Sequence, residues 1–266
     1  MIDPTEIRHF YQSTALRLPK VWNLSRKHVR VALPNRRFLK LNNYRHRINE
    51  NSLRRLCAKL TPVHVYMSVL DWLFPERVGT KYKAKYALPI GGEYVVDVDS
   101  HVLLVPHDHN RVHSICIGCL DVSRRVALHI CEAIEDNYRD VYIAFSGRRG
   151  FHIHVLDFDL RDWTHYNARN PIKSHEVARF MYTRYLAARC HGFDRSHFIV
   201  STDPMRIITA PNSVNGESGL VCLSIGNRKD LEHLVIEDLV ARAQFTAHPE
   251  LYDSIPVPLL AGMGGG

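Results

Sequence analysis

The sequence predicts an α+β fold. Apolar residues recur at helical spacing in some segments and alternate with a period of two in others, and the two kinds of segment are interspersed. Several predicted strands follow one another closely, as in hairpins, so we expect mixed or antiparallel sheets flanked by helices. With 266 residues and 45% hydrophobic content, the chain can bury a sizeable core. We predict one domain over residues 1–260 and a flexible tail at 261–266.

The helices are predicted from capping residues and apolar spacing. Asp3 is a suitable N-cap and Pro4 suits a first helical position, so a helix is expected over 3–18. Leu53, Leu56 and Leu60 fall on one face of a second helix at 51–60. Further helices are predicted over residues 119–138, 173–192 and 236–245.

One hairpin stands out among the predicted strands. The segment from Phe151 to Leu156 alternates apolar residues with histidines, and residues 140–145 precede it as a second strand. Gly147 and Gly150 lie in the connection and permit the positive φ angles that a tight turn needs. The other predicted strands cover residues 63–74, 93–105, 204–211 and 220–226.

The charge pattern indicates an anionic partner. Lys and Arg number 35 against 27 Asp and Glu, which gives a net charge of +8 and a pI near 9.2. No acidic residue lies between Glu6 and Glu50. The cations of this segment include Arg17, Lys20, Arg26, Lys27, Arg30, Arg36, Arg37, Lys40, Arg45 and Arg47, with Trp22, Phe38 and Tyr44 among them. An ordinary solvated face is the alternative, but the mixture with aromatic residues favours contact with nucleic acid or nucleotides.

The sequence indicates an intracellular protein. No apolar run approaches the length of a membrane span, and the first residues lack the pattern of a secretion signal. The six cysteines include one close pair, Cys116 and Cys119, which suits a reducing compartment. We expect the cytoplasm of a prokaryotic host or the nucleus of a eukaryotic one, and no membrane partner.

Two carboxylates lie in the predicted strand 93–105. Asp97 and Asp99 are two residues apart, so a strand projects both from one face. Mg²⁺ or Mn²⁺ accepts such hard oxygen ligands, and metal ions of this kind can assist phosphoryl transfer. Asp203 would complete the cluster if the strand that follows it lies next to 93–105. The alternative is that this common Asp-x-Asp pattern marks a surface edge or a turn.

A second constellation, at about 105–120, suits zinc. His107, His109, Cys116 and Cys119 form a set of four ligands of the kind that zinc prefers, and His113 competes for either histidine position. Because all four ligands are side chains of the protein, the site is expected to be structural. A chance cluster is the alternative, since the chain has 17 histidines.

The order of these motifs resembles the catalytic small subunit of archaeal and eukaryotic DNA primases, in the primase-polymerase superfamily. Asp-x-Asp, a short zinc-ligand loop, a helix, Ser-Gly-Arg-Arg-Gly-x-His and a further acid follow one another in the same sequence. Upstream, "NRRFLKL" and "PVHVYMSVLDW" are similar to early strands of the family. Downstream, "DPMRIITAPNSVNGESGL" resembles its third acid and the segment after it. The resemblance covers about residues 5–230.

The resemblance implies a template-directed nucleotidyltransferase that synthesises RNA or DNA primers. Asp97, Asp99 and Asp203 would hold catalytic Mg²⁺ or Mn²⁺, a 3′-hydroxyl would attack the α-phosphate, and pyrophosphate would leave. Implied partners are single-stranded DNA template, nucleoside triphosphates, and a primase large subunit or other replication proteins. The implied nucleotide-binding residues are Ser146, Arg148, Arg149, His152, Arg36 and Arg206. A pair of adjacent arginines suits a triphosphate clamp.

The chain departs from the family pattern after the third acid. Thr209, Asn215 and Glu217 stand where the family often carries basic residues, and the short interval from Asp157 to Asp203 indicates a pared-down member. Two other classes of function stay open: a non-catalytic zinc-containing nucleic-acid-binding protein, and a metal-dependent phosphodiesterase. The sequence leaves open ribonucleotide or deoxyribonucleotide preference, and primer synthesis or extension.

Overall fold

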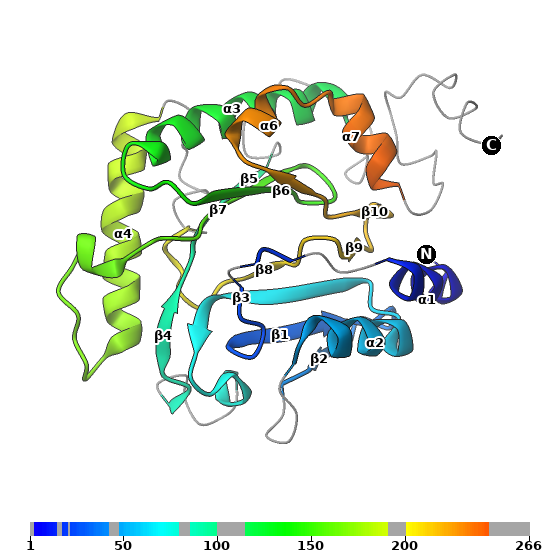
Figure 1. Ribbon diagram of the computed structural model, residues 1–266, viewed down its shortest axis with the longest axis horizontal. Helices are drawn as coiled ribbons and strands as arrows, with labels where there is room; N and C mark the ends of the chain where they lie inside the picture. The colour runs from blue at the N-terminus through cyan, green and yellow to red at the C-terminus, as the bar shows by residue number, and fades with distance from the viewer. Residues whose placement is uncertain are drawn as a thin grey trace.

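Two antiparallel sheets form the centre of the molecule, and helices cover them (Figure 1). The computed structural model describes residues 3–14, 18–20, 22–42, 48–79, 86–99, 115–190 and 201–244. The predicted α+β class with antiparallel sheets is therefore confirmed. The predicted tail at 261–266 and the loop that carries His107, His109 and His113 lie outside the described residues. The assignment of 1–260 to one domain stays a prediction.

The first sheet is built around the long strand β3 (His64–Trp72). One edge of β3 pairs with β1 (Lys27–Ala32), which in turn pairs with β2 (Phe38–Lys40). The other edge pairs first with β8 (Ile207–Thr209) and then with β4 (Pro89–Gly92). Helices α1 (Pro4–Ser13) and α2 (Glu50–Leu60) bury their apolar residues against one face of this sheet, together with Val29, Val31, Val65 and Met67.

The second sheet has the strand order β11-β6-β7-β5. These strands are Ser224–Gly226, Val141–Phe145, Gly150–Val155 and Tyr94–Asp99. Its apolar face packs against α3 (Ile117–Glu135), α4 (Pro171–Arg189), α6 (Arg228–Glu232) and α7 (Ile236–Ala243). The remaining elements are short: η1 (Pro75–Arg77), η3 (Leu160–Asp162), β9 (Val214–Asn215) and β10 (Leu220–Val221).

The predicted N-caps explain where the first helix begins but not where it ends. Asp3 accepts a hydrogen bond from the Thr5 N–H at 2.8 Å, as expected of an N-cap. The helix stops at Ser13, because Thr14 has extended backbone angles. Asn49 and Ser52 form a capping box at the start of α2, which confirms the second helix to within one residue.

The strand predicted over 93–105 is confirmed over its described residues, and residues 100–105 lie outside the described part of the chain. Its described part is β5, which ends at Asp99, and β4 directly before it belongs to the other sheet. Glu93 is the single residue between the two strands, so the chain crosses from one sheet to the other there (Figure 1). The predicted strand 220–226 is divided, into β10 and β11, and β1 was not predicted from apolar alternation.

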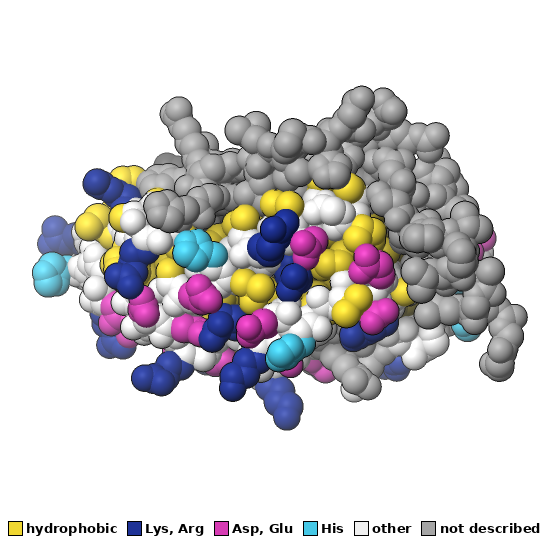
Figure 2. Space-filling model, turned by 90° about the horizontal axis from the view of Figure 1, so that it is seen from above, with side chains coloured by type: hydrophobic (Ala, Val, Ile, Leu, Met, Phe, Trp, Pro, Cys, Tyr) yellow, Lys and Arg dark blue, Asp and Glu magenta, His cyan; other side chains and the backbone are white. Residues whose placement is uncertain are grey.

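The helical face seen from above carries charges of both signs (Figure 2). On α3 and α6 these charges pair locally: Asp121 contacts Arg124 and Arg125, and Arg228 contacts Glu132 and Glu135. A mixed, paired surface is not the electrostatic footprint of a nucleic-acid-binding face. Among the described helices, none is long and apolar enough to cross a membrane.

Buried neutral histidines should make stability depend on pH. His28 is 1% exposed, its Nδ1 lies 3.3 Å from the Pro75 carbonyl oxygen, and its Nε2 accepts a hydrogen bond from Arg30. Burial, with Arg30 and Lys40 nearby, lowers the pKa of His28 from 6.5 to about 4. Because the unfolded chain binds the proton more readily, stability is full above pH 6.5 and falls as the pH drops toward 4.

We expect the free energy of unfolding to fall by about 2 kcal/mol between pH 7.5 and pH 5 on account of His28. Urea unfolding at a series of pH values should therefore give a flatter profile for His28→Gln than for the wild type. The matched control is His165→Gln, which changes an exposed histidine and should leave the slope unchanged. Parallel profiles for His28→Gln and wild type would contradict the role of His28.

Candidate active site

The two adjacent acids lie on one face of β5, as predicted. Val96 and Val98 are fully buried under the helices, whereas Asp97 and Asp99 are 22% and 33% exposed on the opposite face. In the β5–β7 ladder Asp97 pairs with His152 and Asp99 pairs with Gly150. Strand pairing therefore brings the two acids next to the turn between β6 and β7. This turn carries Arg148 and Arg149, the predicted triphosphate clamp, and is called the clamp turn below.

An arginine lies against each acid. Arg206 places Nη2 3.0 Å from Asp97 Oδ2, and Arg149 places Nη2 3.4 Å from Asp99 Oδ2. Both arginines were predicted to bind nucleotide. Each arginine places a positive charge beside one carboxylate. The two arginines therefore offset the repulsion between the closely spaced acids.

His152 is almost completely buried beside Asp97. Its Nε2 lies 3.7 Å from Asp97 Oδ1, and its Nδ1 has no hydrogen-bond partner among the described residues. Burial lowers the pKa of His152 to about 4, although Asp97 opposes this shift. The ring is therefore neutral at neutral pH, and one ring nitrogen can donate a hydrogen bond while the other accepts.

The turn between β6 and β7 is held by its own serine. Ser146 Oγ accepts hydrogen bonds from the backbone N–H groups of Arg148 at 3.4 Å and Gly150 at 3.2 Å. Gly147 has a φ of 81°, as the sequence predicted. The expectation of a positive φ at Gly150 was wrong: this residue begins β7, and glycine is required there because a Cβ would lie 1.6 Å from the Val98 carbonyl oxygen.

A second loop, residues 215–218, supports the turn from outside. Asn215 Nδ2 donates to the Ser146 carbonyl at 3.3 Å, and Ser218 Oγ donates to the Gly147 carbonyl. Glu217 forms an ion pair with Arg148. Asn215 and Glu217 were singled out only as departures from a family pattern, but in the structure both contact the clamp turn.

The third acid, Asp203, does not join the other two among the described residues. The condition set from the sequence was that the strand after Asp203 lies next to β5, but β8 pairs with β3 instead. Asp203 Oδ1 accepts a hydrogen bond from the Met205 N–H at 2.8 Å. Within the described part of the chain, no group of three His, Cys, Asp or Glu side chains could hold a metal ion. A catalytic role for Asp203 stays a prediction.

Half of the predicted zinc site is described. Cys116 caps the N-terminus of α3 and Cys119 lies in its first turn, and both are buried. Burial raises the pKa of Cys119 to about 12, and a hydrogen bond with Cys116 contributes, so the two thiols lie together as a ligand pair requires. His107 and His109 lie outside the described residues. Zinc therefore stays a prediction.

Arg36 lies apart from the acids, in the turn between β1 and β2. It is exposed and has a φ of 62°. Within the described ranges, no ion pair joins it to Asp97 or Asp99. Its assignment to nucleotide binding stays a prediction.

Sequence reasoning missed a buried polar cluster next to the site, on the same face of the second sheet. Glu93 is 3% exposed, and its Oε2 accepts hydrogen bonds from Trp22 at 3.0 Å and lies 3.1 Å from His154 Nδ1. Lys27 Nζ lies 3.6 Å from Glu93 Oε1 and 3.2 Å from Asp71. Lys27 and Trp22 were interpreted as parts of an exposed basic segment, but both are buried.

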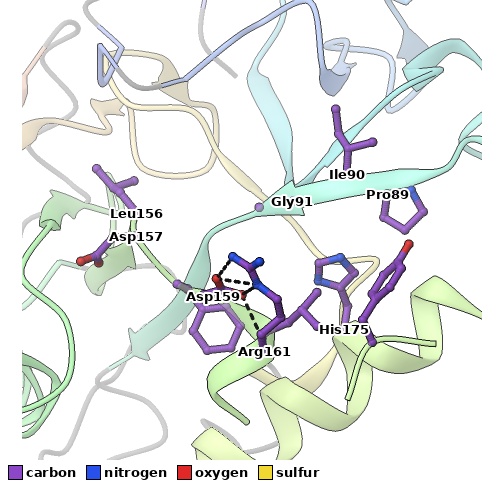
Figure 3. Close-up of a pocket in the computed structure, with 12 residues that line it drawn as sticks. Pro89, Ile90, Gly91, Leu156, Asp157, Asp159, Arg161 and His175 are labelled. Atoms are coloured by element: carbon purple, nitrogen blue, oxygen red, sulfur yellow. Dashed lines mark hydrogen bonds and ion pairs between the residues drawn. The ribbon is translucent and has the colours of Figure 1, made fainter. Parts of the chain in front are cut away.

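A separate pocket of about 510 Å³ lies between β4 and the start of α4 (Figure 3). Two of its charged residues, Asp159 and Arg161, are bonded to each other, at 2.9 Å between Arg161 Nε and Asp159 Oδ2. Burial, with Arg179 nearby, lowers the pKa of His175 in its wall to about 4. This pocket lacks the paired acids and clamp residues, so the β5–β7 site is the stronger candidate.

Gly150 gives a test of how closely β5 and β7 must approach. Gly150→Ala should separate the strands at Asp99 and lower the free energy of unfolding by about 3 kcal/mol or more. The matched control is Gly91→Ala in β4, where an added Cβ meets nothing within 4 Å. Urea unfolding of both variants is the measurement, and equal stabilities would contradict the close approach.

The sequence is similar to those of several DNA primase small subunits, and one solved structure has a similar fold. No family model matches the chain. The DNA primase small subunit of Pyrobaculum calidifontis is 26% identical over 219 residues, covering 70% of this chain and 68% of that protein. The subunit of Pyrobaculum arsenaticum is 26% identical over 240 residues, covering 73% and 69%. That of Methanocaldococcus jannaschii is 30% identical over 122 residues, 43% of this chain and 33% of that protein.

Among solved structures, the polymerase domain of Mycobacterium tuberculosis ligase D in complex with DNA has a similar fold. The TM-score is 0.50 with 12% identity, and the match covers 90% of this chain and 88% of that one. The predicted resemblance and the predicted catalytic-domain fold are both confirmed by these comparisons, except for the zinc loop.

Proposed function

We propose that this chain, which is a relative of DNA primase small subunits, is a template-directed nucleotidyltransferase that synthesises primers. The observation that carries the proposal is the β5–β7 ladder, which places a pair of carboxylates beside a turn of two arginines and a neutral histidine. A phosphoryl-transfer site needs carboxylates that bind a divalent metal ion. It also needs basic side chains that bind the triphosphate.

Asp97 and Asp99 are the proposed ligands of Mg²⁺ or Mn²⁺. Their oxygens suit a hard divalent cation, and they share one face of β5. When bound, such a cation offsets the negative charge that develops on the phosphate oxygens. A second ion and the participation of Asp203 are part of the same proposal.

The clamp would bind the triphosphate. Arg149 and Arg206 now lie against carboxylates, and on substrate binding each can exchange that anionic partner for a phosphate oxygen. His152 would donate a neutral N–H, and Ser146 keeps its hydroxyl hydrogen to donate because its oxygen accepts from the backbone. In the reaction a bond forms between the primer 3′-oxygen and the α-phosphorus, the bond to pyrophosphate breaks, and the hydroxyl proton passes to solvent.

Zinc is proposed as a structural ion that joins Cys116 and Cys119 to His107 and His109. Thiolates and imidazoles suit zinc, whereas carboxylates suit magnesium, so the two kinds of metal should separate by ligand chemistry. Single-stranded DNA and nucleoside triphosphates are the proposed partners, and a large subunit is a further proposed partner.

The proposal is tested by synthesis on unprimed single-stranded DNA with Mg²⁺ or Mn²⁺ and either ribonucleotides or deoxyribonucleotides. Asp97→Asn or Asp99→Asn should reduce incorporation by at least about 10³-fold, because each removes a charge that binds the cation. Circular dichroism should remain that of the wild type. Near-normal turnover in either variant would contradict the assignment, and degradation of a primed template without nucleotides would indicate a phosphodiesterase.

Glu217 provides a second test, because its carboxylate competes with the substrate for Arg148. Glu217→Gln should lower the nucleotide KM by about 3- to 5-fold with kcat little changed, which matches the small free energy of a partly exposed ion pair. The matched control is Glu132→Gln on α3, which also breaks an exposed ion pair with an arginine. A raised KM for Glu217→Gln would show that Glu217 positions Arg148 and does not compete for it.

A further inference from the structure

The face of the first sheet that α1 and α2 leave uncovered has an unusual composition. Because side chains alternate along a strand, Val29, Val31 and Val65 point to the helices and their neighbours point to the other face. That other face carries aromatic and basic side chains: Phe38, Tyr66, His64, Arg30 and Lys40.

Three of these rings form a stacked row. Phe38 and Tyr66 have ring centroids 6.3 Å apart at an interplanar angle of 28°, and Tyr66 and His64 are 5.5 Å apart at 20°. The small residue Ala32 pairs with both Phe38 and His64, which leaves Phe38 room to lean over β1 toward Tyr66. Phe38 ends the row with 61% of its surface exposed. A large exposed ring in a stack offers a face on which a further ring can pack.

Three cations lie next to the residues of this row in the sequence or in the strand register. Arg37 is exposed and directly precedes Phe38, while Arg30 pairs in register with both Tyr66 and Lys40. Lys40 Nζ donates to the Val78 carbonyl at 2.7 Å. Among the described residues, no carboxylate forms an ion pair with any of these three cations. Arg30 and Arg37 therefore lack an ion-pair partner in the described part of the chain, unlike the paired charges on α3 and α6, whereas the Glu76 carboxylate lies near Lys40.

Strand β3, which carries Tyr66 and His64, is bonded to segments of the candidate active site. Tyr66 pairs with Thr209 in β8, and the carbonyl of Arg206, just before β8, accepts a hydrogen bond from Val69 at 3.0 Å. Arg206 in turn contacts Asp97. Beside His64, the Val63 carbonyl accepts a hydrogen bond from Gly216 at 2.7 Å, in the loop that supports the clamp turn. The strand that carries Tyr66 and His64 is therefore bonded to the segment that carries Arg206 and to the loop that supports the clamp turn.

We propose that this face is a binding site for single-stranded nucleic acid, with a base stacked on Phe38 and phosphates bound by Arg37, Arg30 and Lys40. The inference rests on the proposed function, because it names the surface by which the template strand reaches the acids. A single strand fits better than a duplex, since only unpaired bases present their ring faces to an aromatic side chain.

The test is fluorescence anisotropy of a short labelled oligothymidine in EDTA without nucleotides, so that binding is measured apart from catalysis. Phe38→Ala should weaken binding by about tenfold or more, because stacking on one ring is lost. Arg37→Ala should lower the dependence of log K on log salt by about 0.7. The matched control is Tyr166→Ala, which removes an aromatic side chain that is 51% exposed elsewhere. It should bind like the wild type.

Phe38→Trp gives a direct reading of stacking. The exposed indole should bind the strand at least as well as phenylalanine, and its emission should be quenched by the oligonucleotide more than that of the wild type, which already contains three tryptophans. Absence of added quenching together with wild-type binding by Phe38→Ala would overturn the proposed surface.

The outcomes separate this inference from the proposed function. If Phe38→Ala binds like the wild type while the wild type incorporates nucleotides, the surface is wrong and the function stands. If Phe38→Ala loses binding but the wild type incorporates nothing under any metal and nucleotide condition, the function is wrong and the surface stands. Weak binding by Tyr166→Ala equal to that of Phe38→Ala would also overturn the surface, because the effect would not be local.

Discussion

The buried carboxylate of Glu93 is the interaction on which the rest of the arrangement depends. Glu93 is the one residue between β4 of the first sheet and β5 of the second, and its side chain is bonded to both sheets. Its backbone N–H donates to Val69 at 3.1 Å, and its carbonyl accepts from Arg179 of α4. Burial would raise the pKa of Glu93, but Lys27, His154 and Trp22 together lower it below its ordinary value. Removing one member would leave a buried charge unpaired, which costs about 3–5 kcal/mol.

The position of this cluster explains why the acids can be exposed on a rigid strand. Glu93 holds the start of β5, and Asp97 lies four residues further along the same strand. His154, which contacts Glu93, is on β7 two residues after His152. Because these spacings are even, the buried Glu93–His154 cluster and the partly exposed Asp97–His152 pair lie on the same face of the same two strands, one next to the other. A shift of β5 against β7 by one residue would move valines into the site and the acids into the core.

Charge neutralisation governs the site itself. Two carboxylates, two arginines and a buried neutral histidine occupy a small region, and a loop carboxylate holds a third arginine. When a triphosphate and a divalent metal ion bind in such a site, the triphosphate can take over the arginines and the metal ion the carboxylates. The total charge of the site then changes little. Arg30 lies on the open face of the first sheet, where it pairs in register with Tyr66, and no ion pair within the described ranges involves it. This difference in charge balance is the reason why the proposed catalytic site and the proposed strand-binding face are placed on different parts of the molecule.

The sequence by itself determined the local features of this protein. The period of two in β5 places Asp97 and Asp99 on one face, the glycine before the two arginines permits the positive φ of the clamp turn, and capping residues begin α1 and α2 within a residue of the predicted positions. Only the tertiary structure decided which distant residues meet. The partners Arg206 with Asp97, Glu217 with Arg148 and Lys27 with Glu93 are separated by many residues, and β8 pairs with β3 and not with β5. Side-chain alternation is dictated by backbone geometry within a few residues, whereas strand pairing depends on how complete faces bury against one another, which no short segment encodes.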